Sequence, residues 1–435
     1  MRATEVLRRY AAGERDFRNT NLRDQNFKNQ DLSGADFSGA DIRSTTFIGA
    51  KLKGCNFSEA KAGLSYCRTA LLVLISWLLA AIAGFLTGLF GVLAALIFSN
   101  GSIDVVTGLT FLLLVALLGL LVLNGTNEIT VIIAFIVVAL FVVSVGNINA
   151  STGTAAVAFA GIITIPGTGA FAFTLAVVEA ILFAFADTVP FVFAVAVLLA
   201  VLVASTVAIV FAAVVLVTST VAIAFAVVII IVSAYLGWRT LQGDLRDDWI
   251  RSVVIGWAAI GGTNFREADL SGTCFTQVRL KSTDLRWTNL DRTDWHRAKL
   301  LDRARVGGTI LLDPKVRDLL VTHRGAGQFY VGCNLKGANL AGADLSNADL
   351  TEADISGATI QDASLERANM TKTQALGTQF AGAQLTGACL EAWNIDATTQ
   401  LDGAICDYVY LLRNRQERRP SSGNFQPGEF TKLFE

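Results

Sequence analysis

Two carboxylates stand inside the most apolar part of the chain, where an ionisable side chain is least expected. Glu179 lies about midway along 170–186, and Asp187 follows on roughly the same side of a helix. Carboxylates inside a membrane are costly and often mark a path for protons or cations. The structural alternative is that Asp187 caps a helix starting near Pro190, while Glu179 hydrogen-bonds a neighbouring serine or threonine. The pair is a candidate proton or cation site.

The two histidines form no recognisable catalytic or metal site in the sequence. His296 and His323 are far apart in the chain, and neither is near a second ligand. A histidine metal site or a Ser-His-Asp triad therefore has little support. The six cysteines lack metal-binding spacing, and we expect all of them to be reduced, structural thiols. We expect no catalytic residue, no cofactor, no metal and no enzymatic activity.

The elements around Glu179 and Asp187 are apolar runs long enough to cross a bilayer. The chain is 53% hydrophobic and 16% charged, against about 25% charged in an ordinary soluble protein. Between Arg68 and Arg239 there is no lysine or arginine. Runs of 18 or more apolar residues are typical of membrane spans. We expect about six spans, with five or seven as alternatives: 71–98, 105–123, 129–145, 154–186 interrupted at 166–169, 189 to about 217, and 220–236.

The basic residues on both sides of this block predict its orientation. The connecting loops carry no positive charge, so the positive-inside rule places both flanks, and with them both termini, in the cytoplasm. Two cytoplasmic flanks require an even number of spans. Residues 239–254 carry leucines and Trp249 at four-residue spacing, which predicts a helix lying in the membrane interface.

The flanks are dominated by a period of five residues. Units such as Ala343-Asp344-Leu345 and Ala348-Asp349-Leu350 recur without a slip. Neither a helix nor a flat strand keeps every fifth side chain on one buried surface, so the backbone must turn in each unit and form a solenoid. The period runs through Phe17, Leu22, Phe27, Leu32, Phe37, Ile42, Phe47, Leu52, Phe57 and, weakly, Ala62, and again from Ile260 through Phe265, Leu285, Trp295, Leu300, Ile310, Tyr330, Leu340, Phe380 and Ile395 until it fades by Ile405, with Arg305 as the exception.

These A-(D/N)-L-x-x units resemble the pentapeptide-repeat proteins, which are abundant in bacteria and especially in cyanobacteria. The resemblance implies a right-handed, four-sided β-helix with twenty residues per coil. In that fold the central apolar residue and the small residue two before it point inward, which places Cys55 and Cys333 at inward positions. The Asp or Asn before the central residue points outward and bonds the turn backbone. The expected fold class is therefore mixed: a pentapeptide-repeat solenoid plus a polytopic α-helical transmembrane domain.

A twenty-residue coil predicts which side chains stack. Phe17, Phe37 and Phe57 should form one wall, with Phe27 and Phe47 on the opposite wall. The first array makes only two and a half coils, a small core for a free-standing repeat domain. We therefore predict that both arrays form one solenoid, with the membrane block as a long insertion. The structural core ladder is represented by Phe17, Phe37, Phe57, Leu340, Leu345, Leu350 and Leu365.

A short helix is expected where the repeats break. Asp313 is a plausible N-cap before Pro314, and Gly325 a plausible stop. Its apolar face would carry Val316, Leu319, Leu320 and His323. The full organisation is a capping helix (1–13), the first array (14–66), a transmembrane domain (69–238), an interfacial helix (239–254), the second array (255–312 and 328–407) around a helical insertion (313–327), and a polar, mobile tail (408–435).

Two function classes remain open. One is a membrane-anchored scaffold whose solenoid face binds an unknown protein partner. The other is a small transporter or channel with the solenoid as a regulatory domain. The net charge of −1 argues against a DNA-mimicking or nucleic-acid-binding role. We favour the scaffold, integral to a bacterial plasma or thylakoid membrane, with the lipid bilayer as a second partner.

Overall fold

The computed structural model describes residues 1–66, 68–71, 252, 255–256, 259–426 and 428–434. The chain divides into two compact units, Met1–Ser65 with Gly261–Glu435, and Tyr66–Ile260. The predicted spans and interfacial helix, apart from a few residues, lie outside the described residues, and so do Glu179 and Asp187. In the part of the chain that the structure does describe, no helix has the length and apolar character needed to cross a membrane.

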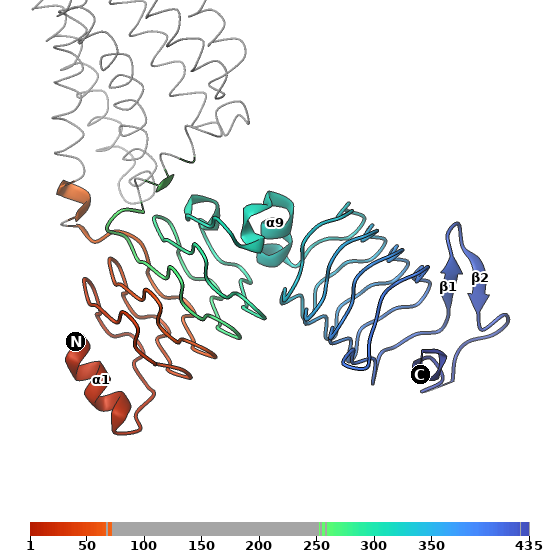
Figure 1. Ribbon diagram of the computed structural model, residues 1–435, viewed down its shortest axis with the longest axis horizontal. Coiled ribbons are helices and arrows are strands. Elements are labelled where there is room, and N and C mark those ends of the chain that lie inside the picture. The colour runs from red at the N-terminus through yellow and green to blue at the C-terminus, as the bar shows by residue number, and fades with distance from the viewer. Residues whose placement is uncertain (67, 72–251, 253–254, 257–258, 427, 435) are drawn as a thin grey trace, which may run out of the picture. The chain divides into compact units, whose positions relative to one another are not determined.

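The first unit is a stack of four-sided coils. Each five-residue unit contributes one bridging residue followed by a two-residue turn. Parallel bridges join residues twenty apart, as in Asp16↔Asp36 and Asp36↔Asn56. The Phe17 amide donates to the Asp36 carbonyl at 2.8 Å, so the backbone of one coil is satisfied by the next. Figure 1 shows these coils as successive rungs.

The turns explain the polar half of the repeat. The residue two after the central one adopts a left-handed backbone, with φ of 54° at Asn19 and 72° at Gly34, and glycine and asparagine tolerate this conformation best. The outward aspartates bond the same turn: the amides of Ser33 and Thr351 each donate at 3.0 Å to the carboxylate two residues before. The acidic ladder is therefore structural.

The inward side chains form a continuous apolar stack. Ring centroids lie 5.5 Å apart for Phe17 and Phe37, and 5.1 Å apart for Phe37 and Phe57. Phe27 and Phe47 stack at 5.3 Å on the opposite wall. Both predicted stacks are thus confirmed. Offset stacking of this kind adds to the gain from burying large aromatic surfaces.

The two arrays form one solenoid, as predicted. Residues of the last coil of the first array pair with residues 218 positions later: Thr46↔Asn264, Lys51↔Asp269, Asn56↔Cys274 and Lys61↔Arg279. The Phe57 amide donates to the Cys274 carbonyl at 2.8 Å. The residues between Ser65 and Gly261 are therefore an insertion at one corner of the solenoid.

Helix α1 (Ala3–Ala11) lies at the N-terminal end of the solenoid. Its Val6 is fully buried against the core cluster. The Tyr10 hydroxyl donates to the Ser33 carbonyl at 2.9 Å, and the Ala3 amide donates to the Gln25 side chain at 2.8 Å. The helix therefore caps an end that would otherwise expose unpaired backbone edges (Figure 1).

The inward register slips by one residue near the end of 255–312, the first segment of the second array, which the sequence pattern did not predict. Leu300 adopts φ of 61° and turns away, while Leu301, in the 3₁₀-helix η2 (Leu301–Arg303), is buried. The bridge Asp284↔Arg305 then spans twenty-one residues, and Val306 is buried at the next rung. The predicted inward position of Leu300 was wrong. Ile310 is partly buried against the core, and Leu311, also in η3 (Ile310–Leu312), is fully buried.

The C-terminal segment is folded, so the prediction of a mobile tail at 408–435 was wrong. Strands β1 (Val409–Leu412) and β2 (Gln416–Arg419) form an antiparallel hairpin, and η4 (Thr431–Leu433) follows. Phe430 is buried, and its ring lies 5.5 Å from that of Phe434, which contacts Trp393 at 5.1 Å. Ile260 and Ile405, expected to be inward, are more than half exposed because they lie where the regular coils begin and end.

Truncating Phe37 tests the aromatic stack. Phe37→Ala should lower the free energy of unfolding by about 3–5 kcal/mol, because a large ring is removed between two others. Phe329→Ala is the matched control, since Phe329 is 67% exposed and its loss should change stability by less than about 0.5 kcal/mol. Urea-dependent proteolysis of the full chain measures both, and equal effects would contradict the stack.

An engineered disulfide tests the continuity of the two arrays. Asn56→Cys places a thiol on the rung beside Cys274, within the separation that a disulfide requires. Mild oxidation should link the two residues, as read by peptide mass spectrometry without reduction. Asp36→Cys, one rung farther from Cys274, should stay unlinked. A link in neither variant, or in both alike, would count against a single solenoid.

Candidate functional site

The described site residues of the sequence analysis lie in the solenoid core. Every one of them is 1% exposed or less, in the closely packed interior of the coils. Such positions hold the fold together and offer no surface to a ligand. They are Phe17, Phe37, Phe57, Leu340, Leu345, Leu350 and Leu365.

Helix α9 (Pro314–Thr322) interrupts the coils and creates the main surface irregularity among the described residues. The Asp313 side chain accepts from the Lys315 amide at 2.8 Å, which confirms the predicted N-cap. Val316, Leu319 and Leu320 are buried, as the predicted apolar face requires.

The C-terminal end of α9 differs from the prediction. His323 is the left-handed cap with φ of 54°, and its amide donates to the Leu319 carbonyl at 2.8 Å. Gly325, which was predicted to stop the helix, serves packing instead. A Cβ added there would lie 2.7 Å from Leu345 and 2.9 Å from Leu319. His323 therefore lies at the helix end and not on its apolar face.

The coils before and after α9 are directly bonded. The Arg292 amide donates to the Gly337 carbonyl at 2.6 Å, and the Arg297 amide donates to the Val321 carbonyl at 2.8 Å. The Asn339 side chain donates to the Arg292 carbonyl at 3.5 Å. The solenoid thus continues past the insertion, with the end of α9 wedged against one side.

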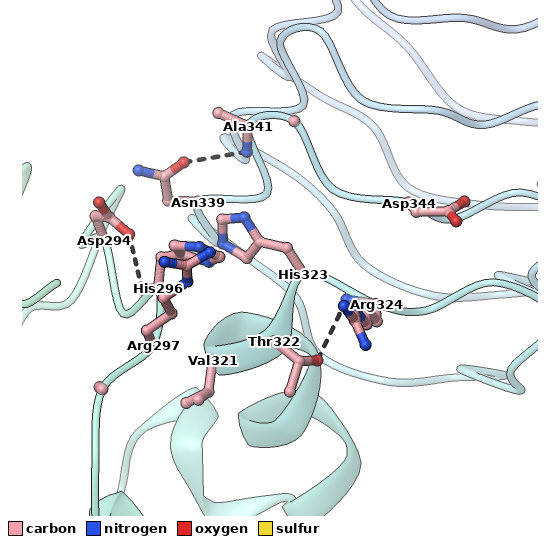
Figure 2. A pocket seen from close by; sticks show the side chains of 12 residues that line it. Asp294, His296, Arg297, Val321, Thr322, His323, Arg324, Asn339, Ala341 and Asp344 are labelled. Carbon is pink, nitrogen blue, oxygen red and sulfur yellow. Dashed lines mark hydrogen bonds between the residues drawn. The ribbon is translucent and has the colours of Figure 1, made fainter. Parts of the chain in front are cut away.

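A pocket of about 900 Å³ lies where α9 meets the coils. Figure 2 shows side chains from three segments around it: the coil before α9, the end of α9, and the coil after it. Its walls carry both acidic and basic groups. Charged and imidazole groups in the lining include Asp294, His296, Arg297, His323, Arg324 and Asp344.

The two histidines meet in this pocket, which corrects the sequence-based view that neither is near a second ligand. Their ring centroids are 4.6 Å apart. His296 Nδ1 and His323 Nε2 are buried, and neither has a hydrogen-bond partner among the described residues. The twenty-residue length of a coil does not predict that these two histidines meet, because α9 replaces coil residues between them.

Burial lowers the pKa of His323, and a positive charge on His296 would lower it further, while Asp294 acts in the opposite direction. Within the described ranges, no three histidine, cysteine or acidic side chains are grouped as a metal ion requires. The arrangement can exchange hydrogen bonds with a polar group from a partner, and burial makes His323 harder to protonate because it lowers the pKa.

The five cysteines that the structure describes are free. Cys55 is buried at the inward position expected of it, and burial raises the pKa of its thiol to about 12. Cys333 is half-buried, and its thiol lies 3.7 Å from an Asp313 carboxylate oxygen. Low-pKa thiolates are the reactive form of cysteine, so Cys55 is suited to packing.

The repeats match the family model of pentapeptide repeats in eight copies, within residues 20–59, 261–281, 331–366 and 360–392. The solenoid of this chain is built of pentapeptide repeats. Its coils, turns and inward ladder are those that the repeat requires. No curated protein sequence matches the chain.

Three solved pentapeptide-repeat proteins from cyanobacteria are similar to the chain. HetL, involved in heterocyst differentiation regulation in Nostoc sp. strain PCC 7120, is 14% identical, with 94% of this chain and 96% of HetL covered and a TM-score of 0.19. A second Nostoc PCC 7120 protein is 27% identical over 21% of this chain and 74% of its own, with a TM-score of 0.16. Rfr23 from Cyanothece 51142 is 18% identical over 33% of this chain and 59% of its own, with a TM-score of 0.14. These TM-scores are below 0.5, so the assignment rests on the repeats themselves.

The histidine pair predicts a pH dependence of stability. Because the pKa of folded His323 lies below its unfolded value of about 6.5, the unfolded chain binds more protons in mild acid. The free energy of unfolding should not change above the unfolded pKa of about 6.5. It should fall as the pH drops below that value and become constant again below the folded pKa of His323.

Imidazole NMR can measure this directly, because the chain has two histidines. The His323 signal should titrate below pH 6.5. In the variant His323→Asn, asparagine tolerates the left-handed backbone of the helix cap, and the missing imidazole signal identifies that of His323. At pH 5 the α9 amides of this variant should lose less protection from hydrogen exchange than those of the original protein. A His323 that titrates at or above 6.5 would contradict the burial argument.

Proposed function

We propose that this pentapeptide-repeat protein is a membrane-anchored scaffold whose solenoid binds a protein partner beside α9. The observation that carries the proposal is a group of apolar side chains that the solenoid leaves in solvent. Phe329 is 67% exposed, Val331 53% and Leu312 64%. Surface apolar groups of this kind are typical of protein interaction sites.

Chain geometry gathers these three residues. Phe329 and Val331 flank one inward residue, Tyr330, so both point out from the same side of a coil. Leu312 precedes Asp313, whose carboxylate accepts from the Cys333 thiol at 3.7 Å. The surface formed by Leu312, Phe329 and Val331 is called the apolar face below.

The membrane anchor is supported by the composition and place of the insertion. Residues 69–238 contain no lysine or arginine and consist largely of apolar runs. The ends of the insertion are adjacent, since the Gly63 amide donates to the Thr263 hydroxyl at 2.8 Å. Adjacent ends suit an even number of spans, with the solenoid on the cytoplasmic side.

Photo-crosslinking in the native membrane tests the scaffold. A photoreactive phenylalanine at position 329 should give one discrete adduct in the membrane fraction, and Val331→Ser should reduce its yield. The same label at Lys53, an exposed residue of the first array, is the control and should give no such adduct. Equal labelling from both positions would overturn the apolar face as the partner site.

The acidic pair distinguishes the scaffold from a transporter. Glu179→Gln combined with Asp187→Asn should leave the position-329 adduct and the cellular phenotype intact. Loss of the phenotype in the double variant, with normal expression and an intact adduct, would favour the transporter instead.

Reporter fusions test the proposed topology. Fusions at Lys61 and at Ser421 should both report a cytoplasmic location.

A further inference from the structure

Three basic side chains are stacked on one side of the solenoid. Lys61 pairs with Arg279, and Arg279 pairs with Lys299, through parallel bridges on successive coils. Neighbouring strands are about 4.8 Å apart, and all three side chains are exposed. These three residues are called the basic column below.

The basic column is unusual because like charges on adjacent rungs repel one another. On the opposite side of the same coils, Lys51 stands between Asp31 and Asp269, so charges alternate there. Among the described residues, Lys61, Arg279 and Lys299 have no ion pair or side-chain hydrogen bond. The column therefore holds concentrated positive charge without an internal partner.

The next acid along this side does not relieve the repulsion. Asp41 accepts hydrogen bonds at 2.7 Å from both Arg23 and Arg43. Burial alone would raise the pKa of Asp41, but the hydrogen bonds from Arg43 and Arg23 lower it to about 2. The Asp41 carboxylate is therefore already paired with these two arginines and does not neutralise the basic column.

The column lies beside the corner where the chain leaves and re-enters the solenoid. Lys61 is two residues before Gly63, whose amide is bonded to Thr263. The apolar insertion occupies the sequence between these two coils. If the insertion enters a bilayer, Lys61 lies within a few residues of the point where the chain leaves the solenoid for the membrane.

We propose that Lys61, Arg279 and Lys299 bind the headgroups of anionic lipids. The proposal rests on the membrane anchor proposed above and adds a lipid preference to it. A basic residue near an anionic leaflet gains about fivefold in binding, and salt screens the attraction. The rigid spacing of the coils lets the three charges act together.

Lysine reactivity in nanodiscs tests the proposal on the full chain. In phosphatidylglycerol-containing discs at low ionic strength, acylation of Lys61 and Lys299 should be about fivefold slower than in phosphatidylcholine discs. Lys51 is the internal control and should react equally in both. Molar salt should abolish the difference.

Two variants sharpen the result. Arg279→Gln removes the central charge and should weaken the lipid protection of both flanking lysines, whereas Arg324→Gln, outside the column, should not. Equal reactivity of Lys61 and Lys299 in the two discs would overturn the lipid proposal while leaving the anchor intact. Failure to enter either disc would overturn both proposals. Equal protection by inorganic phosphate in phosphatidylcholine discs would mean a general anion site and would also overturn it.

Discussion

The structure depends on backbone hydrogen bonds that one coil cannot make by itself. Each rung places a single residue in the ladder between two coils. The Asp36 amide and carbonyl both bond the preceding coil, at Arg15 and Phe17, while the adjacent Phe37 amide donates to the Asn56 carbonyl of the next coil. An isolated coil would keep the bonds within its own turns, such as that from the Ala40 amide to the Phe37 carbonyl, but would leave its ladder groups unpaired. Stacking satisfies these groups and buries the inward side chains in the same step, so the ends of the stack become the vulnerable points.

This constraint accounts for the features that are not repeats. Helix α1 covers the first coil, and the aromatic group of Trp393, Phe430 and Phe434 lies at the other end. It also explains why a long insertion is tolerated: the coils close across it, through pairs such as Thr46↔Asn264. Because the insertion starts and ends at adjacent residues of one corner, it adds no break to the ladder.

Much of the fold could be predicted from the sequence, because a five-residue period ties each side chain to a wall of the coil. The phenylalanine stacks and the joined arrays followed from the five-residue spacing together with the twenty-residue coil that the family resemblance implies. The Asp313 cap followed from its place before Pro314. The shift from Leu300 to Leu301 could not, since one extra residue absorbed in a turn leaves the apolar pattern readable in two registers. The folded C-terminus was missed because its polar composition hid a few well-placed aromatic residues.

The candidate site was harder to predict than the fold. His296 and His323 meet only because α9 replaces coil residues between them, and the direction of an inserted helix is not encoded in the repeat period. The apolar face likewise arises from outward positions, and Phe329 stands where other units carry an aspartate or asparagine that bonds the turn. Both features are therefore departures from the regular repeat.

Amide hydrogen exchange at the junction tests the central claim, that one solenoid closes across the insertion. The amides of Leu52 and Phe57 belong to the first array, but their acceptors are the carbonyls of Asp269 and Cys274 in the second. Exchange of the full chain, followed by mass spectrometry, should show these amides as protected as the Leu350 amide in the middle of the second array. Rapid exchange at Leu52 and Phe57, with Leu350 still protected, would mean that the first array ends in an open edge and would contradict the account.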